Sequence, residues 1–210
     1  MIKEIVIENN SNILKNESLK KHTTFGIGGN AKYLVFPKNI KEIISAIKFA
    51  KQNNLETFFF GSGSNLLIDD NGYNGMIISL KKTFKKIIFS KNKILVESGV
   101  MLGNMVKLAI KRNITGFESM IGVPGTVGGA IIMNAGAHGT EISEKLISIR
   151  TLNYDGKIKT YLKNNLLFSY RHSNIPLNEI LIDALFQSSM GDSKEINSNK
   201  AEVSKNRKET

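Results

Sequence analysis

The stretch that decides the fold reads GFESMIGVPGTVGGAIIMNAGAHG, residues 116–139. Ten of its 24 residues are glycine or alanine. Glycine lets the backbone approach a bulky group closely, but it costs conformational entropy, so such a run is expected where a ligand or another segment uses it. Turns favour Asp, Asn and Ser around their glycines, whereas Val123, Val127 and Ile131 are interleaved here. The stretch predicts a buried wall with exposed amides that faces a ligand; a string of tight turns is the alternative.

A second glycine loop, Gly61-Ser-Gly-Ser-Asn65, directly follows the β-rich run Thr57–Phe60. A strand that opens into such a loop presents amides and hydroxyls that can hold an anion. The loop is not a Walker loop, because no Gly-Lys-Ser/Thr follows it, and a Rossmann fingerprint would need a helix directly after the glycines. Instead, Leu66–Ile68 predicts a short strand and Asp69–Gly72 a turn.

Length and composition limit the possibilities. With 210 residues the chain suits one large domain or two small ones. The absence of cysteine excludes disulfides, thiolate metal sites and cysteine nucleophiles. The start lacks the apolar core of a signal peptide, and the apolar runs are too short to span a bilayer. We therefore expect a cytoplasmic protein without a membrane partner.

The net charge of +11 comes mainly from lysine, since only four of the 29 basic residues are arginine. Nucleic-acid readers usually use arginine on base edges and place aromatic residues between basic ones. The scattered lysines favour a small polyanionic ligand such as a nucleotide or pyrophosphate. Nucleic acid is not expected as a partner, although a polyanion-binding protein remains an alternative.

Regular structure is expected on both sides of the glycine loops, in an α+β arrangement. Asn39 predicts a helix N-cap, with Glu42 completing a capping box and an apolar face running to Ala50. A second helix is expected over about 102–113, and Asp155-Gly156 predicts a hairpin. Residues 1–19 predict a short apolar segment, Ile5–Ile7, and a linker. Strands are expected at Tyr33–Phe36, Thr57–Phe60, Met76–Ser79, Ile87–Phe89, Ile94–Glu97, Ile147–Leu152, Lys157–Tyr161 and Ile180–Phe186.

Conventional catalytic machinery is sparse. The spacing of the three histidines, His22, His138 and His172, suits no metal site, and no Gly-x-Ser-x-Gly elbow is present. What remains is the two glycine loops and one conspicuous arginine, Arg171. Polar loops that converge on a large ligand fit a cofactor that brings its own reactivity.

Four blocks of the sequence stand out together and in this order: Thr24–Gly29, Gly61–Leu67, Gly122–Ala130 with Met133–Ala137, and Ser169–Ser173. They resemble the UDP-N-acetylenolpyruvoylglucosamine reductase family, a family of flavoenzymes of peptidoglycan synthesis. The resemblance covers about residues 20–187. It implies a vanillyl-alcohol-oxidase-type FAD-binding domain (the PCMH type), made of two α+β subdomains at about 20–81 and 82–187.

The resemblance also implies roles for single residues. The loop Gly61–Asn65 is expected to hold the pyrophosphate of non-covalently bound FAD. Arg171 matches the family's catalytic arginine, which grips a carboxylate, and Tyr170 beside it is expected to contact substrate. The implied cofactor-binding residues are Gly61, Ser62, Gly63, Ser64, Asn65, Gly122, Pro124, Gly125, Thr126, Gly128, Gly129, Ala130 and Asn134.

In the reaction of this family, NADPH reduces the flavin, which then passes hydride to the enolpyruvyl methylene carbon of the UDP-sugar. The family continues into a substrate domain that carries a serine acid and an assisting glutamate. We expect residues 188–210 to be a polar tail, a mobile helix at the start of that domain, which the sequence lacks, so that turnover is impaired unless the domain is supplied. A non-catalytic FAD-binding remnant is the alternative, and the oligomeric state stays open.

Overall fold

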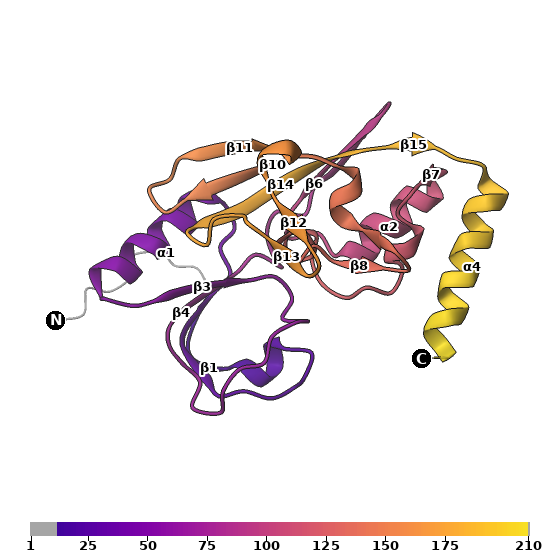
Figure 1. Ribbon diagram of the computed structural model, residues 1–210. Coiled ribbons are helices and arrows are strands. Elements are labelled where there is room, and N and C mark those ends of the chain that lie inside the picture. Colours follow the sequence, from indigo (N-terminus) through magenta and orange to yellow (C-terminus); the bar gives the residue numbers. More distant parts are fainter. Residues whose placement is uncertain (1–11, 210) are drawn as a thin grey trace.

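The computed structural model describes residues 12–209, with side chains up to residue 206, and is built on two β-sheets (Figure 1). The segment predicted at Ile5–Ile7 lies outside the described residues. A four-stranded sheet has the order β1-β2-β4-β3, in which β2, β4 and β3 run parallel and β1 is antiparallel. Its strands are β1 (Ile13–Ser18), β2 (Asn30–Val35), β3 (Thr57–Phe60) and β4 (Tyr73–Ser79).

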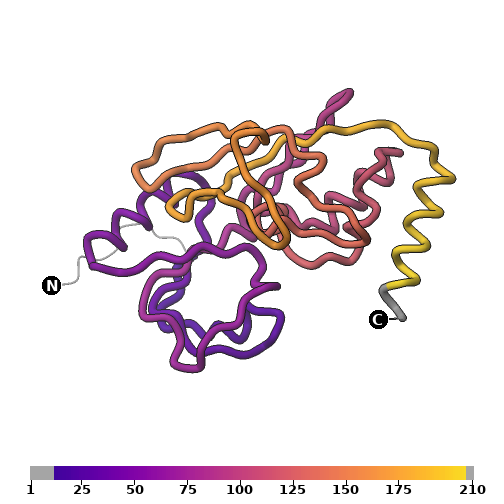
Figure 2. The backbone as a smooth tube through the Cα atoms, viewed as in Figure 1, coloured from indigo at the N-terminus to yellow at the C-terminus, as the bar shows by residue number. Residues whose placement is uncertain are grey.

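The second sheet is antiparallel throughout, with the order β11-β10-β14-β6-β5. The hairpin predicted at Asp155-Gly156 is confirmed, since it joins β10 to β11. In Figure 2 the first part of the chain forms the lower lobe and the later part the upper one. The strands are β5 (Ile87–Ser90), β6 (Lys93–Glu97), β10 (Leu146–Asn153), β11 (Ile158–Leu162) and β14 (Glu179–Gln187).

Helix α1 (Ile40–Gln52) packs against both sheets. Its predicted N-cap is confirmed, because the Asn39 side chain accepts from the Glu42 N–H at 3.0 Å. The Glu42 carboxylate reaches one residue further back than in a standard capping box and accepts from the Lys38 N–H at 2.7 Å. The buried face of α1 shares one apolar cluster with both sheets: Met76 and Ile78 of β4, Leu152 of β10, and Ile180 and Ile182 of β14.

Two sequence predictions in this first part of the chain are wrong. Residues 13–18 were expected in a linker but form β1, an edge strand; an edge strand is held by backbone hydrogen bonds and needs no alternating apolar face. Leu66–Ile68 form no strand; Leu66 and Ile68 instead pack, partly buried, against an apolar cluster of the four-stranded sheet. The turn at Asp69–Gly72 is present, with Asp69 O accepting from the N–H groups of both Gly29 and Gly72 at 2.9 Å.

Helix α2 (Leu102–Lys111) packs into the larger apolar core, and the chain turns at Asn113, whose φ is +55°. The glycine-rich stretch was predicted as a wall and contains a short helix, α3 (Val127–Ile132). A two-stranded hairpin, β12 (Phe168–Ser169) and β13 (His172–Ser173), follows later. The remaining elements are η1 (Leu19–His22), β7 (Ile114–Thr115), η2 (Glu118–Met120), β8 (Gly136–Ala137), β9 (Thr140–Glu141), η3 (Ile142–Lys145), η4 (Lys163–Asn165) and β15 (Ser189–Met190).

The polar C-terminal segment forms helix α4 (Ser193–Glu209), at the right of Figure 1. Two apolar side chains one heptad apart, Ile196 and Val203, are buried, and the helix lies against η2. Within residues 12–209 no helix is both long and apolar enough to cross a membrane.

A buried carboxylate ties three strands of the larger sheet. Glu179 is 8% exposed and accepts from Lys159 Nζ at 2.6 Å, Tyr161 Oη at 3.0 Å and Thr151 Oγ1 at 2.5 Å. Burial tends to raise the pKa of this carboxyl, but the hydrogen bonds from Lys159, Thr151 and Tyr161 outweigh it, so the pKa lies below the ordinary glutamate value.

A lowered folded-state pKa stabilises the fold above the unfolded pKa of glutamate, about 4.3, and this contribution is lost as the pH falls through the folded value. We expect Glu179→Gln to lower the free energy of unfolding at neutral pH by about 1–3 kcal/mol, because it leaves donors unpaired. We also expect the melting temperature of Glu179→Gln to fall less than that of the wild type as the pH is lowered from neutral to acid. Glu202→Gln, at an exposed position of α4, is the control. An equal fall in Glu179→Gln and the wild type would contradict the lowered pKa of Glu179.

Candidate functional site

The structure brings the two glycine loops into contact, although 56 residues lie between Asn65 and Gly122 along the chain. A Cβ added to Gly61 would lie 2.2 Å from Thr126 Oγ1, and one added to Gly125 would lie 3.0 Å from Ser64 Oγ. Real Cβ atoms do not come as close as the first distance, so Gly61 has to be glycine for the loops to meet. The φ of Gly125, +119°, is a second reason for glycine at this contact.

A third loop closes the other side of the Gly61–Asn65 loop. Thr24 N–H donates to Gly63 O at 3.0 Å. A Cβ on Gly63, whose φ is +73°, would lie 2.0 Å from His22 O. The loop is therefore held between η1 and the start of α3, and Ser79 Oγ of β4 fixes it further by donating to Gly61 O at 2.9 Å.

The Gly61–Asn65 loop has unused hydrogen-bond donors. Within residues 12–209, none of its five backbone N–H groups donates to a protein acceptor, and the buried Ser62 Oγ has no partner. Buried polar atoms without partners are rare and costly. Donors gathered in one loop, with a hydroxyl held ready among them, suit a ligand with several anionic oxygens, as a pyrophosphate has.

Helix α3 presents an open face beside this loop. Gly129 is exposed, and a Cβ there would meet only Thr126 Oγ1, at 3.6 Å. Ile132 and Met133 continue the same face with 37% and 36% exposure. Gly122 and Pro124 are exposed as well. A bare backbone followed by apolar side chains suits a flat ring system.

Four other residues expected at the cofactor, which lie in or next to α3, are buried. Gly128 is buried against Ser98, with 2.8 Å from its added Cβ to Ser98 Cβ, and Ala130 lies in the core. Thr126 caps α3 by accepting from Gly129 N–H at 3.3 Å. Asn134 was expected on the cofactor surface but is fully buried, with its amide nitrogen bonded to Glu141 and Ser169. Asn134 directly follows Met133 of the open face, at the point where the helix has ended and the chain turns into the interior.

The Arg171 hairpin stands at the other end of α3. Arg171 lies in the turn between β12 and β13 with a φ of +55°, an uncommon conformation for a side chain of this size. Its guanidinium lies 5.1 Å from the ring centre of Tyr170, which is 81% exposed. Ser173 Oγ donates to Ile132 O at 2.7 Å, which docks the hairpin on the helix. Because α3 has six residues, about 9 Å of helix separates the glycine loop from this turn.

Sequence reasoning missed Ser79, Ser98 and His22 as supports of the glycine loops and α3. Ser79 and His22 are the last residues of β4 and η1, and Ser98 directly follows β6; the one local signal is that Ser79 ends an apolar run. Ser98 Oγ and His22 Nδ1 are buried without partners, as are Ser62 Oγ, Thr83 Oγ1 and Asn134 Oδ1. Of these five atoms in the described residues, all but Thr83 Oγ1 belong to the two glycine-rich stretches or to residues that contact them.

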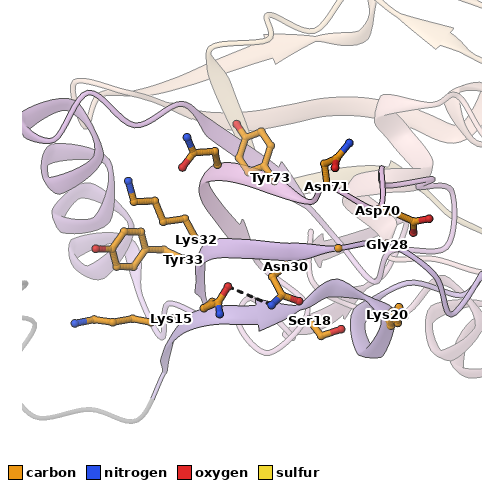
Figure 3. A pocket seen from close by; sticks show the side chains of 13 residues that line it. Lys15, Ser18, Lys20, Gly28, Asn30, Lys32, Tyr33, Asp70, Asn71 and Tyr73 are labelled. Carbon is orange, nitrogen blue, oxygen red and sulfur yellow. Dashed lines mark hydrogen bonds between the residues drawn. The ribbon is translucent and has the colours of Figure 1, made fainter.

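A separate hollow of about 970 Å³ opens at the amino end of β2 and β4 (Figure 3). Lys15, Lys20 and Lys32 line it, and Asp70 is its one acidic residue among those described. Asn30 Nδ2 donates to Asn16 Oδ1 at 3.1 Å inside it. The three lysines are exposed to solvent. None of the buried polar atoms without a hydrogen-bond partner lines this hollow. The Gly61–Asn65 loop, by contrast, carries donors that lack acceptors.

Comparison with known proteins identifies the family. The sequence model described as "FAD binding domain" matches residues 31–161. The chain is 38% identical to the UDP-N-acetylenolpyruvoylglucosamine reductase of Clostridium tetani over 97% of this chain and 67% of that protein. The chain belongs to the UDP-N-acetylenolpyruvoylglucosamine reductase family.

Solved structures agree with this assignment. The reductase of Thermus caldophilus superposes with a TM-score of 0.80 at 29% identity, covering 94% of this chain and 69% of that one. The vanillyl-alcohol-oxidase-type flavoprotein of Myceliophthora thermophila shares only 13% identity over 77% of this chain and 32% of that one, but its TM-score of 0.59 confirms the predicted fold class. The chain spans 54% to 70% of the length of the family reductases it resembles.

FAD is the cofactor that goes with this domain, and the donors at the glycine loops fit it. Among residues 12–209 no group of three or more His, Asp or Glu side chains is placed to hold a metal ion. The predicted FAD-binding domain is thus confirmed.

Gly129 and Gly128 form a matched pair of neighbours. We expect Gly129→Ala to stabilise the FAD-free protein by about 0.5–1 kcal/mol, because the site is open and alanine is the better helix former. Gly129→Leu should weaken FAD binding at least about tenfold by blocking close approach of the ring. Gly128→Ala should instead destabilise the fold, since its Cβ would meet Ser98 at 2.8 Å. Thermal melts and FAD titrations separate the two effects; unchanged FAD affinity in Gly129→Leu would remove α3 from the cofactor site.

Ser62 offers a test of the anion loop. Removing an unpaired buried hydroxyl should leave the FAD-free protein as stable or slightly more stable, whereas losing a donor to the ligand should weaken FAD binding by about 1 kcal/mol, or about fivefold. We therefore expect Ser62→Ala to leave the melting temperature of the FAD-free protein unchanged or slightly raised, and to raise the FAD dissociation constant about fivefold. Ser90→Ala, far from the loop on β5, is the control, and equal FAD affinity in Ser62→Ala and the wild type would contradict the role.

Proposed function

We propose that the chain is the FAD-binding part of an NADPH-dependent oxidoreductase that reduces UDP-N-acetylglucosamine enolpyruvate to UDP-N-acetylmuramate in peptidoglycan precursor synthesis. The single observation that carries the proposal is the docking of the Arg171 turn on α3. This docking places a permanent cation at one end of a six-residue helix whose other end forms the contact between the glycine loops.

The chain would hold FAD between its two glycine loops. The free amides of Gly61–Asn65 and the Ser62 hydroxyl would bind the pyrophosphate, and the open face of Gly129, Ile132 and Met133 would carry the ring system. When bound, FAD supplies hydride transfer. The protein supplies the position of the ring and the surface that excludes water from one side of it.

Arg171 would bind the carboxylate of the enolpyruvyl group. A guanidinium stays protonated at every relevant pH and can donate two parallel hydrogen bonds to a carboxylate. Reduction of the double bond next to that carboxylate builds negative charge there, and a fixed cation stabilises this charge more than it stabilises the ground state. The positive φ of Arg171 supports the role, because such backbone strain concentrates at functional sites. Tyr170 would flank the same substrate group.

The alternatives have less support. A polyanion-binding protein would use the lysine-lined hollow. Lys15, Lys20 and Lys32 are exposed there, and none of the described residues that line the hollow has a buried donor without a partner. A non-catalytic FAD-binding remnant would need no cation held at the end of α3. The experiment on Arg171 decides between this remnant and the enzyme.

We expect Arg171→Ala to slow reduction of the substrate about 100-fold or more, by analogy with the loss of one donor to a developing anion. Arg171→Lys should recover only part of the rate, since it keeps the charge and loses the fork. The measurement is the return of the visible flavin band after the NADPH-reduced, FAD-loaded chain is mixed anaerobically with UDP-N-acetylglucosamine enolpyruvate. It is made with the chain alone and with the C-terminal part of a family reductase added.

Arg112→Ala is the matched control, because Arg112 lies over the Phe89 ring, on an element that takes no part in the proposed site. Equal rates for Arg171→Ala and the wild type would contradict the role of Arg171. Absence of any return of the flavin band in the wild type, under both conditions, would contradict the proposed reaction.

A further inference from the structure

Asn134 lies at the centre of a buried polar network. Its side chain is 0% exposed, and Nδ2 donates to Glu141 Oε2 at 2.6 Å and to Ser169 O at 3.0 Å. Both neighbours can only accept, so the orientation of the amide is fixed: the flipped side chain would place its oxygen against two other oxygens. Both N–H donors are used, while Oδ1 is buried without a partner.

This network joins three segments that are far apart along the chain. Asn134 follows the C-terminal end of α3, Glu141 ends β9, and Ser169 ends β12 directly before the Tyr170-Arg171 turn. The Glu141 end is rigid, since Glu141 and Glu144 cap η3 reciprocally, with Glu141 N–H donating to Glu144 Oε1 at 2.7 Å. Among the described residues, one other hydrogen bond links the hairpin to α3, the bond that Ser173 Oγ donates to Ile132 O.

We propose that Asn134 is a positioning residue for Arg171, and this rests on the function proposed above for Arg171. By holding Ser169 O to the end of α3, Asn134 fixes the start of the turn from which the guanidinium projects. The Arg171 side chain is long and exposed. The position of its guanidinium therefore depends on the position of the backbone turn that carries it. The cation is thereby set relative to the same helix that faces the cofactor.

Asparagine is the residue that meets both demands of this position. Its φ is +41°, in the left-handed region that asparagine and glycine adopt readily. Glycine would fit the backbone but has no donor. Aspartate would fit in size, but it would face the Glu141 carboxylate with a like charge and the Ser169 carbonyl with no donor.

The first experiment measures hydrogen–deuterium exchange of residues 167–174 in the FAD-free chain. We expect about tenfold faster exchange of this hairpin in Asn134→Gly, which removes the donors without backbone strain. Asn113→Gly is the matched control. Asn113 also follows a helix with a φ of +55°, but it is exposed, and its replacement should leave the hairpin unchanged.

A double variant separates positioning from general stability. Asn134→Asp alone should lower the melting temperature and loosen the hairpin. Adding Glu141→Gln restores a hydrogen bond between the two side chains, because the glutamine amide donates to the new carboxylate. The double variant should therefore regain melting temperature while the hairpin still exchanges about tenfold faster, since nothing donates to Ser169 O.

In the FAD-loaded chain, Asn134→Gly should bind FAD as the wild type does, and should raise the KM for the enolpyruvyl substrate about tenfold. Unchanged hairpin exchange in Asn134→Gly would overturn the proposal, as would an equal rise in exchange throughout the chain. Normal reduction by Arg171→Ala would overturn the function proposed for Arg171 instead, so the two failures are distinguishable.

Discussion

The contact between Gly61 and Thr126 is the constraint on which the rest of the structure depends. It lets the end of β3 in the four-stranded sheet touch the start of α3, beside the five-stranded sheet, because the Thr126 side chain packs directly on the Gly61 backbone. Helix α1 holds the same two sheets together on their apolar side through Ile43 and Ile47. The two parts of the chain thus meet twice, once through an apolar core and once where the Gly61–Asn65 loop meets α3. The second contact leaves donors free, and this is where the binding chemistry collects.

Helix α3 relates the cofactor side of the molecule to the Arg171 turn. One face, with Val127 and Ile131, is buried in the core, and the opposite face is left open. Because the helix is rigid and short, any group that rests on its open face has a defined distance to the hairpin docked at its end. The hydrogen bonds of Ser173 and Asn134 hold the exposed two-residue turn that carries Arg171 against the end of this helix.

The charge of the protein has little to do with this site. The surplus of lysine lies on exposed positions, including those around the hollow of Figure 3, and none of the loop residues Gly61–Asn65 is basic. Neutral donors at fixed positions bind anionic oxygens without the side-chain ordering that lysine requires. A net charge of +11 therefore favours the approach of anionic ligands in general and does not select one of them.

The sequence by itself determined the elements whose signals are local. The cap at Asn39, the hairpin at Asp155-Gly156, the two glycine loops and eight of the nine strands of the two large sheets follow from periodicity, capping and turn chemistry, and the motifs determined the family. Tertiary structure decided what depends on distant partners. Residues 13–18 became a strand because β2 offered an edge, whereas Leu66 and Ile68 pack against the apolar cluster of the four-stranded sheet without pairing as a strand. Gly128 and Gly129 are neighbouring glycines, yet Gly128 packs on Ser98 and Gly129 faces outward. Asn134 stands in a cofactor motif but turns inward, because the helix ends there and both Glu141 and Ser169, which come later in the chain, accept from it. Such choices are fixed by contacts between residues far apart in sequence, which local patterns do not contain.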